Sequence, residues 1–447
     1  MGIFITIAWR NLLAARRRSL FLTVAVAIVT AFLVLLNSLT AGVSSNLVSA
    51  ATTLSAGHIN VAGFHKTKPS DSSPIVTNAE PLRKILQEQT PGLDYVIDRH
   101  RGWAKVVGES ASIQAGLYGI DAKQEGVLFK TLQLAKESEY KDGGRDQAFG
   151  DPTQLANKGT VMLFAGQAKR LGVQIGDVVT VRAESPGGRT NTIDLTVVAI
   201  MRDVGLLSSW SVFMPKKDLL TLYQLADTTT GSFLVYLKDI DKAQDTMGEL
   251  RTILTKEGYT LMDYRPEPFF FKFEQVAGED WTGQKLDLTT WKDEVSFLTW
   301  ILTALNTVSF GLIGILFAII AIGIANTMLI SVRERTREIG TLRAIGMGRK
   351  QVLLMFMLEA LILGAFATTV GALVGSLIAI SLNAANIEVP IQAMRAILLS
   401  DVLRLKVEVG QTVLSVVVLT VFTGVSALWP SMRGARMQPV EALQAIE

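Results

Sequence analysis

The chain has 447 residues, of which 49% are hydrophobic, and its mean hydropathy is +0.35. This composition is too apolar for an ordinary soluble protein of that length, and it predicts a membrane protein. The formal charge of +3, with no basic stripe interleaved with aromatic residues, argues against nucleic acid as a partner, and the absence of cysteine excludes disulfides, thiolate nucleophiles and Cys-based zinc sites.

The first elements are an amino-terminal segment and an apolar run. Residues 1–19 place apolar side chains at helical spacing before an arginine cluster, which fits either a cytoplasmic amphipathic helix on the inner leaflet or a simple extension of the first span. Residues 20–43 carry no charge, and about 20 apolar residues suffice to cross a bilayer. The run exceeds the apolar core of a signal peptide, about 7 to 15 residues, so we expect an uncleaved transmembrane helix.

Residues 44–294 have the balanced charge of a soluble, slightly acidic domain. The stretch "DVVTVRAESPGGRTNTIDLTVVAI" predicts a hairpin, and "AEPLRKILQEQ" and "PKKDLLTLYQLA" predict helices, so we expect a mixed α/β domain of two subdomains. The three histidines lack the HxxxH spacing, and no metal site is predicted.

The end of this insert is rich in phenylalanine. The residues are Phe269, Phe270, Phe271 and Phe273. Two interpretations stay open: core packing or an aromatic belt at the membrane interface, and an apolar surface that contacts a lipid or acyl cargo.

Three further apolar runs follow, at 295–332, 351–383 and 409–432, and they predict transmembrane helices 2, 3 and 4. As one helix, the first would be about 57 Å long at 1.5 Å per residue, so it must extend beyond the membrane. Arginine and lysine flank the spans on one side, which places both termini, the segment 333–350 and the tail 433–447 in the cytoplasm. The insert and the loop 384–408 then lie outside.

The segment 333–350 combines many charged residues with a pattern of apolar ones. Its helical pattern places Ile339, Leu342 and Ile345 on one side, and Gly346 and Gly348 supply a stop. An anchor that only fixes topology needs no apolar stripe. A helix that offers apolar and guanidinium contacts to a soluble cytoplasmic protein explains both features.

The stretch "SVRERTREIGTLRAIGMGRKQVLLMFMLEALILG" resembles the signature region of ABC-transporter permeases of the MacB/LolCE/FtsX mechanotransmission type, as do "IAWRNLLAARRRS" and "ALWPSMRGARMQPVEAL". The resemblance implies that 333–350 is the coupling helix on a cytoplasmic ABC ATPase dimer. Carried over by position, the contact residues are Arg335, Arg337, Glu338, Ile339, Leu342, Arg343, Ile345 and Gly346. No Gly-Lys dipeptide occurs, so a Walker A loop is excluded, and ATP and Mg²⁺ are expected on a separate subunit.

Small residues recur within the spans, at Gly311, Gly314, Gly371 and Gly375. They permit close approach of helices, either within one subunit or across a dimer of permeases. The resemblance implies such a dimer, with a second copy or a paralogue.

"GHINVAGF" and the predicted hairpin region resemble the LolC/LolE branch more than the others. This implies a permease in the bacterial inner membrane that releases lipoprotein or lipid-like cargo to a periplasmic carrier. The arginine-rich "RERTREIGTLRAIG" is nearer the MacB type, which implies export with a periplasmic adaptor and an outer-membrane duct. A third alternative is FtsX-like signalling to cell-wall hydrolases without cargo. The chain carries no catalytic motif, so we expect a transporter subunit rather than an enzyme.

Overall fold

The computed structural model describes residues 16–69, 71–387 and 402–438, together with residues 10, 389, 394, 398 and 400. Most of the predicted amino-terminal segment, part of the loop 384–408 and most of the tail therefore lie outside the described residues. The chain divides into a helical unit, formed by its two ends, and an α/β unit that includes Ser45–Ile301.

The helical unit contains four long helices with a short helix between the second and third. Their bounds are α2 (Arg16–Ala50), α12 (Thr299–Glu334), α13 (Thr336–Ala344), α14 (Arg349–Ala384) and α16 (Val409–Ala435). The four long helices are all long and apolar enough to cross a membrane. Each overlaps one predicted span. α12 begins at Thr299 rather than residue 295, because Ser296–Leu298 form a 3-10 turn.

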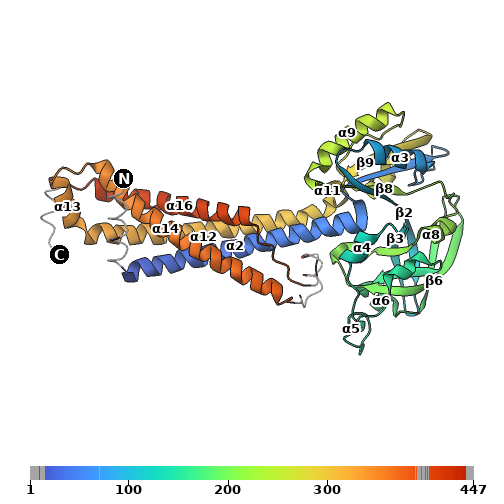
Figure 1. Cartoon of the computed structure of the whole chain (residues 1–447), viewed down its shortest axis with the longest axis horizontal. Coiled ribbons are helices and arrows are strands. Elements are labelled where there is room, and N and C mark those ends of the chain that lie inside the picture. The colour runs from blue at the N-terminus through green and yellow to red at the C-terminus, as the bar shows by residue number, and fades with distance from the viewer. Residues whose placement is uncertain are drawn as a thin grey trace. The chain divides into compact units, whose positions relative to one another are not determined.

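These helices pack through one apolar core and also expose apolar side chains. Val26, Ile324, Ala367 and Leu419, one from each long helix, are buried together. On the outer faces large apolar side chains remain exposed, among them Phe310 at 80%. A helix that is apolar all round belongs in lipid, so the chain is a multi-pass membrane protein. The helices run side by side, with α13 where α12 ends and α14 begins (Figure 1).

The α/β unit is built on nine strands in the order β3-β7-β4-β6-β5-β2-β8-β1-β9. Their bounds are β1 (Ile59–Lys66), β2 (Leu93–Val107), β3 (Ser112–Ile120), β4 (Thr160–Phe164), β5 (Val178–Glu184), β6 (Thr190–Met201), β7 (Ser211–Pro215), β8 (Ser232–Leu237) and β9 (Gly283–Thr290). Because β2 also pairs with β3, the first six strands of this order close into a ring.

The shorter helices cover this sheet. They are the π-helix η1 (Ala51–Ala56), α3 (Ala79–Gln89), α4 (Gly126–Thr131), α5 (Glu137–Tyr140), α6 (Ala165–Leu171), α7 (Gly205–Ser208), α8 (Lys216–Tyr223), α9 (Ala243–Lys256), α10 (Phe273–Gly278) and α11 (Trp291–Glu294), with 3-10 turns at Pro152–Ala156, Ile240–Lys242 and Phe269–Lys272. The mixed α/β class is confirmed. So are the hairpin, formed by β5 and β6, and the predicted helices α3 and α8.

Two large apolar clusters lie in the unit, beside smaller ones. One lies inside the ring and takes residues from its six strands, including Val106, Leu163 and Val197. The other lies between β8, β1 and β9 and the helices α3 and α9, around Val61 and Leu250. β2 belongs to both parts, so the division into two subdomains stays a prediction.

The ends of the α/β unit meet in one strand pair. β1 follows α2 and η1 in the chain, and β9 precedes α11 and α12. The two strands are antiparallel, with Ile59 opposite Thr290 and Lys66 opposite Gly283. This pairing ties together the two segments that lead into the first and second membrane helices.

Candidate functional sites: the helix α13 and an aromatic cavity

One apolar residue of α13 is fully buried in the helical unit. Ile339 is 1% exposed and packs in a cluster with Val332, Met355 and Phe356. Gly346, at φ +111°, ends the segment in a conformation that side chains rarely adopt. Ile339 therefore anchors the short helix, and Gly346 ends the turn that follows it.

Two arginines of the predicted docking set bind within the chain. Arg335 donates to Glu338 at 2.9 Å and to the buried Glu359 at 3.3 Å, and its guanidinium lies 5.7 Å from the ring centre of Phe356. Arg343 donates from Nη1 to the carbonyls of Ala435 and Met437, at 3.0 and 2.6 Å. These carbonyls lie at the end of α16, where helical acceptors lack partners. Both arginines thus fasten α13 to its own unit.

Most of the remaining predicted residues are exposed. Arg337, Glu338 and Gly346 are exposed, Leu342 is half-buried, and Ile345 is 81% exposed. Ile345, which directly follows α13, is the large apolar side chain that this charged segment exposes. The predicted residues therefore form two groups: Ile339, Arg335 and Arg343 hold α13 against the helical unit, and the exposed residues remain available for contact. Contact of that face with an ATPase stays a prediction.

The four phenylalanines also separate. Phe269 is 1% exposed and stacks on Phe64 with ring centres 4.5 Å apart, which is core packing. Phe273 lies beside the same ring at 6.0 Å. Phe270 and Phe271, by contrast, line a cavity, and Phe271 is 61% exposed. The interpretation of an apolar contact surface therefore fits Phe270 and Phe271 best, Phe273 is 39% exposed, and contact of any of them with cargo stays a prediction.

That cavity, called here the aromatic cavity, has a volume of about 350 Å³ and lies within the α/β unit. Its lining residues are Ser55, Gly102, Trp103, Gly116, Leu117, Tyr118, Leu207, Trp210, Pro268, Phe270, Phe271, Glu294 and Phe297. They come from η1, β2, β3, α7 and the segments on either side of β9. Sequence reasoning missed most of them, because single aromatic residues on separate elements give no local pattern.

Beside the aromatic cavity, buried side chains of the sheet hold the end of η1. Arg99 donates to the Leu54 carbonyl at 2.9 Å, Arg101 donates to the Ser55 carbonyl, and the Tyr236 hydroxyl donates to the Thr52 carbonyl at 2.8 Å. Cationic donors are favoured at a helix carboxyl end, where carbonyls lack partners. We call this set of three contacts the arginine joint.

The arginine joint also reaches the second membrane segment. Arg101 Nη1 lies 4.0 Å from Glu294, the last residue of α11, and Arg101 Nη2 donates to Asn60 at 2.9 Å. Burial lowers the pKa of Arg101 below its ordinary value. Burial acts the same way on Arg99, but the bidentate Glu125 outweighs it and raises the pKa of that guanidinium. One buried network thus links the segments that lead to α2 and to α12.

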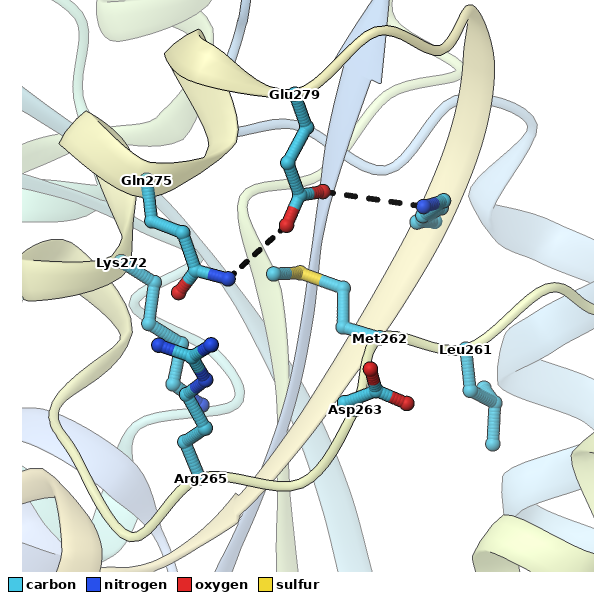
Figure 2. A pocket seen from close by; sticks show the side chains of 8 residues that line it. Leu261, Met262, Asp263, Arg265, Lys272, Gln275 and Glu279 are labelled. Atoms are coloured by element: carbon cyan, nitrogen blue, oxygen red, sulfur yellow. Dashed lines mark hydrogen bonds and ion pairs between the residues drawn. The ribbon is translucent and has the colours of Figure 1, made fainter.

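A second, smaller cavity of about 100 Å³ is polar (Figure 2). Glu279 accepts from Gln275 at 2.9 Å and lies 3.9 Å from Lys285, and Lys272 pairs with Asp287 at 2.8 Å. Glu279, Lys272 and Lys285 thus have partners within the protein. Within the described part of the chain no group of three His, Cys, Asp or Glu could hold a metal.

Comparison with known proteins decides the family. The family profile for the MacB-like periplasmic core domain matches residues 19–253, more than half of the chain, and that for the FtsX-like permease C-terminal domain matches residues 296–439. The chain belongs to the MacB/FtsX family of ABC-transporter permeases. Both matches agree with the arrangement of one span, a large α/β domain and three further spans.

Curated relatives share parts of this MacB/FtsX chain. A macrolide export ATP-binding/permease protein MacB of Chlorobium luteolum is 32% identical over 126 residues, which cover 27% of this chain and 16% of the relative. An uncharacterised ABC transporter permease, YknZ of Bacillus subtilis, is 33% identical over 143 residues, 32% of each chain. The match thus spans less than a third of either relative.

Two solved structures are similar at low identity. The extracellular domain of YknZ from Gram-positive bacteria is 14% identical, with a TM-score of 0.28, over 44% of this chain and 95% of that one. The periplasmic region of MacB from Actinobacillus actinomycetemcomitans is 15% identical, with a TM-score of 0.27, over 43% of this chain and 83% of that one.

Proposed function

We propose that this permease couples ATP hydrolysis on a separate cytoplasmic ATPase dimer to movement of its α/β domain on the other face of the bacterial inner membrane. The ATPase, which binds ATP and Mg²⁺, contacts the exposed face of α13, and two permeases, identical or paralogous, share the complex. Both termini lie in the cytoplasm and the α/β domain lies in the periplasm. The observation that carries this proposal is the mounting of α13, since a push on a helix held by Ile339, Arg335 and Arg343 moves the whole helical unit.

Ile345 tests this assignment. A charge at an exposed apolar residue in the centre of a contact should weaken ATPase binding by about thirtyfold, the effect of losing roughly 2 kcal/mol at a hot spot. We expect Ile345→Asp to remain in the membrane but to purify without its ATPase, as measured by quantitative mass spectrometry of the complex. Ile387→Asp, beyond the far end of α14, is the matched control. Full ATPase retention by Ile345→Asp would show that α13 is only a topology anchor.

For the cargo, we propose release of lipoprotein or lipid-like molecules from the inner membrane. The apolar lining of the aromatic cavity, with Phe270 and Phe271 in its wall, supports this. The match of the MacB-like profile to residues 19–253 favours a second candidate, export with a periplasmic adaptor and an outer-membrane duct. FtsX-like signalling to cell-wall hydrolases is the third.

Native mass spectrometry of the complex from its own membrane separates the three. A bound lipoprotein, or one copy of this chain beside a different permease, supports cargo release. Two copies with an adaptor or duct support the export machine. Hydrolase partners without any cargo would contradict both transport functions.

A further inference from the structure

The aromatic cavity has the lining of a site for an uncharged apolar group. Six of its side chains are aromatic: Trp103, Tyr118, Trp210, Phe270, Phe271 and Phe297. Glu294 is the only charged side chain in the lining, and its Oε1 already accepts hydrogen bonds from Thr289 at 2.6 Å, Phe269 N at 3.1 Å and Asn60 at 3.2 Å. The cavity therefore offers apolar surface and no uncompensated charge to a ligand.

The cavity is open to the outside and has room. Trp103 and Phe271 are 52% and 61% exposed, a large apolar exposure for a domain whose core is otherwise closed. A Cβ added at Gly116 would lie 3.5 Å from the backbone oxygen of Trp210 and 3.9 Å from the ring of Tyr118, both residues of the lining, so there is space for one more carbon atom. The volume of about 350 Å³ lies in the range of small-molecule sites, roughly 300–1,000 Å³.

We propose that the aromatic cavity is a binding site for one hydrocarbon chain of a lipid. The proposal rests on the proposed function, in which the permease handles lipid-like cargo, and it assigns the contact to the α/β domain. A hydrocarbon chain is the ligand that an apolar, uncharged lining accepts without leaving a polar group unpaired.

The position of this site links it to the arginine joint. Ser55, whose carbonyl accepts from Arg101, and Glu294, 4.0 Å from the same guanidinium, both line the aromatic cavity. A bound hydrocarbon chain therefore contacts residues at the ends of η1 and α11. In the sequence, η1 directly follows α2, and α11 lies between β9 and α12. In this proposal, occupation of the site acts on the residues that hold the ends of η1 and α11.

The test uses the full-length protein in lipid nanodiscs with its ATPase, and palmitic acid carrying a diazirine at its terminal carbon as the probe. After photolysis, we expect labelled peptides that contain Trp210, Phe271 or Phe297. Gly116→Leu should fill the cavity and reduce this labelling by about tenfold. Gly126→Leu, an exposed position with no atom within 4 Å, is the matched control and should label like the wild type.

A second variant guards against misfolding. If Gly116→Leu does not reach the membrane, Phe271→Ala, which removes one wall of the opening, should lower the labelling instead. Equal labelling of these peptides in the variant and the wild type, or labels confined to the membrane helices, would overturn the site. If the cavity stays unlabelled while the ATPase remains bound, the site fails and the proposed coupling stands.

Two further probes with the same photoreactive tail identify the kind of lipid that supplies the hydrocarbon chain. Labelling by a triacylated lipopeptide identifies the chain as that of lipoprotein cargo. Labelling by a phosphatidylcholine identifies it as membrane lipid. Either result supports a hydrocarbon-chain site, and the absence of labelling by all three probes would contradict it.

Discussion

Four consecutive residues of β2, Asp98, Arg99, His100 and Arg101, are buried although each is charged or titratable. Successive residues of a strand point to opposite faces, so every second residue shares a face. Arg99 and Arg101 accordingly reach η1, whereas Asp98 pairs with Arg83 and Lys216 on the other side. The charged run "DRHR" inside an apolar strand was the available sequence signal. Its partners could not be predicted, because they lie on distant elements.

His100 makes the stability of the α/β unit sensitive to acid. Burial lowers its pKa to about 4. The Thr229 carbonyl, which Nε2 contacts at 2.8 Å, and Asp98 oppose this shift, and Lys216 adds to it. Between pH 6.5 and this lowered pKa, His100 binds a proton in the unfolded chain but not in the folded one. The contribution of His100 to the free energy of unfolding is therefore complete above about pH 6.5 and decreases as the pH falls, by up to roughly 3 kcal/mol.

We therefore expect the thermal midpoint of the full-length chain in detergent to fall between pH 7 and pH 5. His100→Gln can keep a donor towards Thr229 but cannot titrate, so its midpoint should change less over the same range. An equal change in both proteins would assign the acid sensitivity to other groups.

Among the helices and strands, those that depend on a local sequence pattern could be predicted. The β5–β6 hairpin follows from β-branched runs around a Pro-Gly-Gly turn, with Gly188 at φ +74°. The helices α3 and α8 follow from apolar spacing. The β1–β9 pair joins residues 59–66 to residues 283–290, and no short pattern specifies a partner that distant. The aromatic cavity was unpredictable for the same reason.

The transmembrane glycines differ in their packing. A Cβ on Gly371 would lie 2.3 Å from the Ala27 carbonyl oxygen of α2, and one on Gly375 would lie 2.7 Å from that of Ala31. Gly311 and Gly314 on α12 are exposed and would meet no atom within 4 Å. The first pair therefore packs helices within the subunit. For the second pair, packing against another permease stays a prediction.

Leucine substitutions separate these roles. Gly371→Leu should lower the thermal stability of the purified chain, because overpacking costs about 1–3 kcal/mol. Gly314→Leu should leave the stability of the single chain unchanged and weaken permease dimers measured by crosslinking. Tolerance of leucine at residue 371 would contradict the close approach of α14 and α2.

For the whole molecule, the length of α12 determines how movement can travel. Its 36 residues form one helix of about 54 Å at 1.5 Å per residue, against a hydrocarbon core of about 30 Å. Counted back about 20 residues from Arg333 in its last turn, the membrane part begins near residue 313, and the residues before that continue to the 3-10 turn Ser296–Leu298 and α11. In the proposed coupling, α12 is a rigid rod from α13 to the α/β domain.

A proline tests the rod. Ala304 is exposed in the part of α12 before the membrane, and Ala304→Pro should break the helix there at a cost of about 3 kcal/mol. We expect the ATPase to remain bound and active while cargo release, or crosslinking of the α/β domain that depends on ATP, is lost. Ala304→Leu, which preserves the helix, is the control. Normal ATP-dependent movement in the proline variant would show that α12 does not carry it.

β2 gives part of its length to each half of the sheet. Residues 93–99 pair with β8, and residues 100–107 pair with β3. If β2 separated from its neighbours in one half of the sheet, the pairing and the apolar packing of the other half would be disturbed as well. Their opening should therefore be a single cooperative event, with amides of β4 inside the ring and of β1 outside it sharing one slow hydrogen-exchange class. If the domain unfolds only as a whole, a force applied through one membrane segment is transmitted across the sheet without unfolding one half before the other.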